Sequence, residues 1–130
     1  MKLLSLIAAA GLLVSPAAAQ NVDWGGAPRV EIRISGNRYH PATVRLAAGQ
    51  PVVLRIHNLS RDSHVFSARG FFDAALVRPE DRSVVTGGAI DLEGREAREV
   101  ALVPAAGRYE ARCSQQYHET LGEKGVILVE

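Results

Sequence analysis

Hydrophobic and polar residues alternate along most of this chain, in short runs separated by turn residues. Residues 30–34 alternate apolar with charged side chains, and residues 52–56 repeat the pattern, with Arg55 and His57 on the opposite face. A period of two residues indicates strands with one buried face. Further candidate strands share the same character; they are residues 44–46, 64–67, 89–92, 99–103, 107–113 and 125–129.

The segments between these runs carry residues that favour turns. Gly36-Asn37, Gly87-Gly88 and Glu93-Gly94 are examples of such pairs. Residues 71–77 predict one short helical turn that ends before Pro79. About seven or eight short strands in a domain of about 110 residues predict an all-β fold, an antiparallel Greek-key β-sandwich.

The N-terminal residues have the features of an export signal. Lys2 supplies a positive charge, residues 3–14 form an apolar run, and small residues up to Ala19 form a cleavage site of the A-x-A kind. The apolar run is shorter than the span of about 20 residues that a membrane helix needs. We therefore expect a signal peptide at 1–19, an irregular segment at 20–29 and one domain at 30–130, in a periplasmic protein without a stable membrane anchor.

Charge gives no indication of a polyanionic partner. The formal net charge is +1, and arginines such as Arg33, Arg45, Arg55 and Arg69 are interspersed with acidic and apolar residues. Nucleic-acid and anionic-lipid binding usually require a basic stripe or cluster. We expect a monomer that has neither of these partners.

Cys113 is the only cysteine, and it ends a predicted strand. It cannot form an internal disulfide, and an exported thiol is prone to oxidation unless it is buried or bound to a metal. His118 follows in the next loop, and His64 ends the loop after the strand at 52–58. One thiolate and two imidazoles suit copper that cycles between Cu(I) and Cu(II), with a weak axial fourth ligand. With a carboxylate as the fourth donor, the same set also suits zinc.

Several motifs resemble those of one family. They are Tyr39-x-Pro41, Val44-x-Leu46-x-x-Gly49, Asn58 before the His64 loop, Gly107-x-Tyr109-x-x-x-Cys113 and Cys113-x4-His118. From about Val30 to its C-terminus the chain resembles the cupredoxins, including small bacterial plastocyanin-like and rusticyanin-like proteins and the cupredoxin-like domain of iron-uptake proteins. The resemblance implies a copper site of His64, Cys113 and His118 that transfers single electrons.

The chain departs from this family at the axial position. Relatives carry Met or Gln after the loop histidine, whereas this chain has Glu123, and its only methionine is Met1. A carboxylate is a hard anionic donor that favours Cu(II), so it should lower the reduction potential. The alternative is that Glu123 faces solvent and pairs with Lys124 or an arginine, which leaves three ligands.

The remaining histidines and the other possible functions carry weaker signals. His40 precedes Pro41 in a loop that the resemblance places at the metal end, while His57 is expected on the surface. Copper trafficking or sequestration, an auxiliary role in metal uptake and a metal-free interaction module are alternative functions. A thiol enzyme with Cys113 and His118 would need a third orienting residue and an oxyanion site, for which no motif is present. We therefore expect a non-enzymatic protein whose partner is a periplasmic redox or metal-handling protein.

Overall fold

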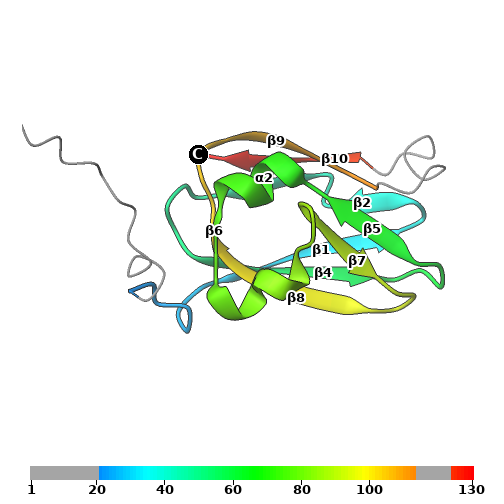
Figure 1. Ribbon diagram of the computed structural model, residues 1–130. Coiled ribbons are helices and arrows are strands. Elements are labelled where there is room, and N and C mark those ends of the chain that lie inside the picture. The colour runs from blue at the N-terminus through cyan, green and yellow to red at the C-terminus, as the bar shows by residue number, and fades with distance from the viewer. Residues whose placement is uncertain (1–20, 114–123) are drawn as a thin grey trace, which may run out of the picture.

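The computed structural model describes residues 21–113 and 124–130, which form two packed β-sheets (Figure 1). The strands and helices of these residues, in chain order, are β1 (Arg29–Ser35), β2 (Arg38–His40), β3 (Thr43–Leu46), β4 (Val52–Asn58), β5 (His64–Ser67), α2 (Arg69–Ala74), β6 (Leu76–Val77), the 3₁₀-helix η1 (Pro79–Val84), β7 (Ala89–Leu92), β8 (Ala97–Val103), β9 (Gly107–Arg112) and β10 (Lys124–Val129). The all-β sandwich predicted from the sequence is confirmed.

Each sheet has five strands, in the orders β2-β1-β4-β8-β6 and β3-β10-β9-β5-β7. Most neighbours are antiparallel, as predicted, but β1 pairs in parallel with β4 and β10 in parallel with β3. The chain crosses from the first sheet to the second between β2 and β3 and returns to the first at β4. This double crossing allows β4 to lie beside β1 without a tight hairpin between them.

The region between β5 and β7 differs most from the expectation. The helix occupies Arg69–Ala74, and Leu76–Val77, predicted as part of it, instead pair with β8. Pro79 is the first residue of η1. Proline lacks a backbone N–H, and the first N–H groups of a helix have no partner within the helix, so proline is well tolerated there. The strands β2 and β6 were not predicted, because segments this short show no useful periodicity. No helix in the described part of the chain is long and apolar enough to cross a membrane.

The core lies between the inner faces of the two sheets. Side chains alternate along each strand, so every second residue of β1, β4 and β8 faces the second sheet. The largest of its fully buried side chains are Phe66, Phe71, Ile32, Ile34, Leu54, Ile56, Ile90, Leu92, Leu102, Ile127 and Val100. Phe66 lies in the centre of β5, with its ring centroid 5.3 Å from that of Tyr39 and 6.4 Å from that of Phe72. This aromatic packing gives β5 a rigid inner surface.

The outer face of the first sheet gathers arginines that are separated in the sequence. The carboxylate of Glu31 accepts a hydrogen bond from Arg33 at 2.9 Å, and this bond holds the pKa of Glu31 below its ordinary value. The carboxylate of Glu99 forms two ion pairs, with 3.4 Å between Oε1 and Arg55 Nη1 and 3.5 Å between Oε2 and Arg29 Nη2. Acidic side chains therefore offset part of the positive charge on this face, in agreement with the charge pattern of the sequence.

Asp81 attaches η1 to β8 and provides a first prediction. Its Oδ2 accepts hydrogen bonds from the backbone N–H of buried Ala101 at 2.8 Å and from Arg78 Nε at 2.9 Å, and the second bond raises the pKa of Arg78. Asp81→Ala should lower the free energy of unfolding by about 1–3 kcal/mol, because it removes the partner of a buried N–H. Urea denaturation measures the change.

Glu80→Ala is the matched control for Asp81→Ala. Glu80 also pairs with Arg78, with 3.9 Å between Oε2 and Nε, but the side chain of Glu80 is 75% exposed. An exposed ion pair of this kind contributes little, so we expect a change within about 0.5 kcal/mol. Equal effects of the two substitutions would contradict the role assigned to Asp81.

Candidate metal centre

Two of the four candidate ligands lie in the described part of the chain, and both are buried. His64 is the first residue of β5 and is 2% exposed, while Cys113 directly follows β9 and is 1% exposed. His118 and Glu123 lie outside the described residues, so their roles remain predictions. Burial protects a thiol from oxidants in solution, and it is one of the two protections that the sequence analysis expected for the single cysteine.

The pairing of β5 with β9 brings these two residues to one end of the sandwich. Ser67 pairs with Arg112, so the adjacent residues Phe66 and Cys113 follow at neighbouring positions, and both are buried. His64 lies two residues from Phe66 and is also buried, on the same inner face. Diagonal neighbours of this kind have Cα atoms about 7–8 Å apart, within the reach of a thiol and an imidazole that share one ion. Figure 1 shows the start of β5 and the end of β9 at the same end of the molecule.

The loop before His64 is held by a hydrogen-bond network centred on Asn58. Asn58 ends β4 and is fully buried. Its Nδ2 donates to the carbonyl oxygens of Asp62 at 2.7 Å and Glu93 at 2.9 Å. Its Oδ1 accepts from the backbone N–H of Ser60 at 3.0 Å and from the Ser60 hydroxyl at 2.8 Å. One side chain therefore joins the end of β4, the loop and the end of β7.

The network ends on the imidazole of His64. Nε2 of His64 lies 2.8 Å from the hydroxyl oxygen of Ser60. A hydrogen bond to one ring nitrogen fixes the plane of the ring, and metal-ligating histidines usually have such a partner. A metal bound by His64 would therefore be held through Nδ1.

The turn between β7 and β8 supports this loop from outside. A Cβ atom on Gly94 would lie 2.2 Å from the carbonyl oxygen of Arg61, so only glycine allows the turn to approach this closely. The backbone N–H of Arg95 donates to the carbonyl oxygen of Ser60 at 2.9 Å. The guanidinium of Arg95 donates to the carbonyl oxygen of Leu59. The resemblance had marked Asn58, but nothing in the sequence indicated the contribution of this turn.

The other two histidines of the described residues are not buried, in contrast to His64. His40 is exposed on β2, with Nε2 3.3 Å from the carbonyl oxygen of Ser35. His57 lies beside Glu31 on the outer face of the first sheet, with 3.9 Å between Nδ1 and a carboxylate oxygen. Within residues 21–113 and 124–130, no three His, Cys, Asp or Glu side chains come together as a metal site.

The donor chemistry of the two described candidates fits a copper or zinc ion. A thiolate and an imidazole are the soft and borderline donors that these two metals prefer. Cys113 follows a paired strand, and His64 is held by the hydrogen-bonded loop before β5. The described residues therefore supply half of the ligand set that the sequence proposes.

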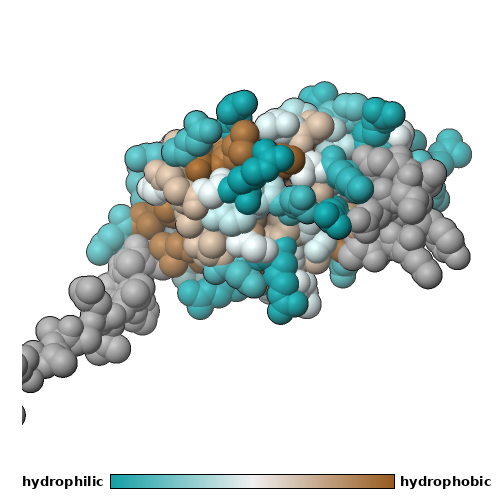
Figure 2. All heavy atoms as spheres, turned by 90° about the horizontal axis from the view of Figure 1, so that it is seen from above, coloured by the Kyte–Doolittle hydropathy of each residue, from teal (hydrophilic) through white to brown (hydrophobic). Residues whose placement is uncertain are grey.

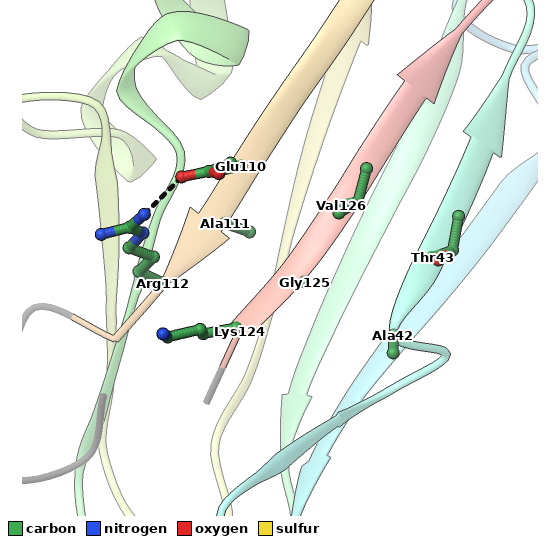
Figure 3. A pocket seen from close by; sticks show the side chains of 8 residues that line it. All are labelled: Ala42, Thr43, Glu110, Ala111, Arg112, Lys124, Gly125 and Val126. Atoms are coloured by element: carbon green, nitrogen blue, oxygen red, sulfur yellow. Dashed lines mark hydrogen bonds and ion pairs between the residues drawn. The ribbon is translucent and has the colours of Figure 1, made fainter. Parts of the chain in front are cut away.

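A surface groove of about 330 Å³ lies along the end of β9 and the start of β10, beside the first residue of β3 (Figure 3). Its lining consists of Ala42, Thr43, Glu110, Ala111, Arg112, Lys124, Gly125 and Val126. Glu110 and Arg112 form an ion pair of 2.5 Å, and Cys113 is not part of the lining. The groove is therefore a charged, open feature that Cys113 does not line. Figure 2 shows the molecule from above, with hydrophilic side chains over much of the surface and a smaller hydrophobic group among them.

Comparison with known proteins defines the class of the fold. No family model and no curated protein matches the sequence. Auracyanin A, a "blue" copper protein from the green thermophilic photosynthetic bacterium Chloroflexus aurantiacus, shares 23% identity over 80% of this chain and 100% of its own, with a TM-score of 0.55. Reduced auracyanin from Roseiflexus castenholzii shares 18% identity over 81% of this chain and 99% of its own, with a TM-score of 0.59.

A larger enzyme contains a similar unit. The McoA multicopper oxidase from Aquifex aeolicus aligns with 84% of this chain, at 13% identity and a TM-score of 0.64, but only 30% of the oxidase is covered. All of these identities are low, so the alignments define the fold. The chain is a cupredoxin-like β-sandwich, which confirms the resemblance found in the sequence.

Proposed function

We propose that this chain is an exported mononuclear copper protein that carries single electrons. Its copper ligands are His64, Cys113 and His118, with Glu123 as an atypical axial ligand. The observation that carries the proposal is the burial of Cys113 and His64 on the same inner face, at one end of neighbouring strands. Copper bound there would supply the one-electron Cu(II)/Cu(I) couple.

The rigidity of the described ligands supports electron transfer in preference to metal exchange. His64 is held through Ser60 and Asn58, and Cys113 follows a strand that is paired on both sides. Ligands that keep their positions in both oxidation states lower the cost of changing the charge on the metal. Auracyanin A, which shares this fold, is described as a blue copper protein.

The side chains that could bind copper also favour an electron carrier over a multicopper oxidase. The oxidase with a similar unit is a multicopper enzyme, so it needs donors for several copper ions. This sequence has one cysteine and four histidines, and because His40 is exposed and His57 lies on the outer face of the first sheet, the remaining donors suit one copper ion. The carboxylate of Glu123 should favour Cu(II) and give a reduction potential below that of a methionine-ligated site.

Export is part of the proposal because the thiol chemistry depends on the compartment. Residues 1–19 direct the chain to the periplasm, where an exposed thiol would be oxidised. The partner is a periplasmic redox or metal-handling protein.

Addition of one equivalent of Cu(II) to the chain without residues 1–19 tests this function. We expect an intense visible band from charge transfer between thiolate and Cu(II), and a reversible one-electron couple in voltammetry. A colourless protein that prefers zinc would overturn the copper assignment. A coloured protein without a reversible couple, which releases copper rapidly to a chelator, would indicate trafficking or sequestration instead.

A further inference from the structure

We infer that Ser60 is a positioning residue, whose hydroxyl holds His64 as the Nε2–H tautomer, so that Nδ1 carries the lone pair before any metal binds. The inference deepens the proposed copper site and rests on it for its biological meaning. The tautomer itself is a property of the metal-free chain. It can therefore be tested even if the copper assignment fails.

The first step is the orientation of the Asn58 amide. Nδ2 faces two backbone carbonyl oxygens, those of Asp62 at 2.7 Å and Glu93 at 2.9 Å. Carbonyl oxygens only accept hydrogen bonds, so the atom that faces them must be the NH₂ group. The other amide atom, Oδ1, is then an acceptor, as the backbone N–H of Ser60 at 3.0 Å also requires.

The second step is the single proton of the Ser60 hydroxyl. Its oxygen lies 2.8 Å from Asn58 Oδ1 and 3.0 Å from the carbonyl oxygen of Asp62, and both of these atoms are acceptors. The hydroxyl must donate its proton toward one of them, because otherwise oxygen lone pairs would face each other at both contacts. No hydroxyl proton then remains for the histidine.

The third step follows from the short contact between Ser60 and His64. Nε2 lies 2.8 Å from the same hydroxyl oxygen, whose proton is already used. The oxygen must therefore accept, and Nε2 must carry the hydrogen. In a neutral imidazole only one nitrogen is protonated, so Nδ1 has the lone pair. A ring in the other tautomer would lose this hydrogen bond.

The backbone of Ser60 and the groups that its hydroxyl contacts are also held in place. The carbonyl oxygen of Ser60 accepts a hydrogen bond from Arg95 N–H at 2.9 Å, which fixes the backbone on its other side. Asn58 and His64 are both buried, so water competes weakly for their hydrogen bonds. The imidazole is thus oriented and in one tautomer without help from a metal.

The test is two-dimensional ¹H–¹⁵N NMR of histidine side chains in metal-free protein, at about pH 8, where free imidazole is neutral. In the unmodified chain we expect the cross-peak pattern of the Nε2–H tautomer for His64. In Ser60→Ala we expect a mixture of tautomers, and Ser60→Thr, which keeps the hydroxyl, should restore the pattern. Ser83→Ala, on an exposed residue of η1, is the control for loss of a hydroxyl elsewhere.

Copper titration of the same variants gives the second readout. Outer partners of metal-ligating histidines commonly contribute about 10- to 100-fold to metal affinity, so Ser60→Ala should lose copper affinity by that factor and Ser60→Thr should recover most of it. An Nδ1–H pattern in the unmodified chain, or an unchanged pattern in folded Ser60→Ala, would overturn the inference. An Nε2–H pattern in a chain that binds no copper would overturn the proposed function alone.

Discussion

Replacement of Cys113 by serine is expected to remove the visible absorption of the copper-loaded protein and to weaken copper binding by orders of magnitude. A thiolate is the donor that gives an intense charge-transfer band with Cu(II), whereas a serine hydroxyl remains protonated and is a poor ligand for copper. Metal binding stabilises the folded state by about 4 kcal/mol when free copper exceeds the dissociation constant about 1,000-fold. Cys113→Ser should lose both the band and this stabilisation, as measured by absorption and thermal unfolding with and without Cu(II).

Ala111→Ser is the matched control for this variant. Ala111 lies on the same inner face as Cys113, and it is 2% exposed. The substitution buries a hydroxyl in the same region without touching the thiol, so it should lower stability and leave the band in place. A band that persists in Cys113→Ser, or that disappears equally in Ala111→Ser, would exclude Cys113 as the copper ligand.

Asn58→Ala is expected to have the largest effect on the stability of the metal-free protein. The substitution leaves the carbonyl oxygens of Asp62 and Glu93 and the N–H of Ser60 without their side-chain partner. These three contacts are part-buried, and a buried polar group that loses its partner costs about 1–3 kcal/mol, so we expect a total of about 3–4 kcal/mol after partial compensation by water. Urea denaturation without copper measures this loss.

The same variant should also weaken copper binding, since the Asn58 network carries the loop that presents His64. Gln50→Ala removes an exposed side-chain amide from the turn before β4 and should change the free energy of unfolding by no more than about 0.5 kcal/mol. If Asn58→Ala cost less than about 1 kcal/mol, the network would not be what holds the loop.

Alternation of apolar and polar residues was sufficient to predict the longer strands. Val52, Leu54 and Ile56 of β4 are all buried, as their spacing predicted. The pattern failed for β2 and β6, because two or three residues show no period. In β6, Leu76–Val77 had been predicted as part of a helical turn, but pairing with β8 prevails over that local preference.

The chemistry of the candidate site was also visible in the sequence, because it depends on residue types. One cysteine with histidines at suitable spacing predicted a metal site, which stays a prediction; the structure shows that Cys113 and His64 are buried at one end of neighbouring strands. The assignment of His118 and Glu123 still rests on the sequence.

The hydrogen bonds and loop contacts that hold His64 in place could be identified only from the tertiary structure. The hydrogen bond from Asn58 to the carbonyl oxygen of Glu93 joins residues 35 positions apart, and the close approach of Gly94 to Arg61 depends on the packing of two loops. Local patterns report which face of a strand is buried and which donors a chain possesses. They do not report which distant backbone groups meet a given side chain, because those contacts form only when the strands that carry them have paired.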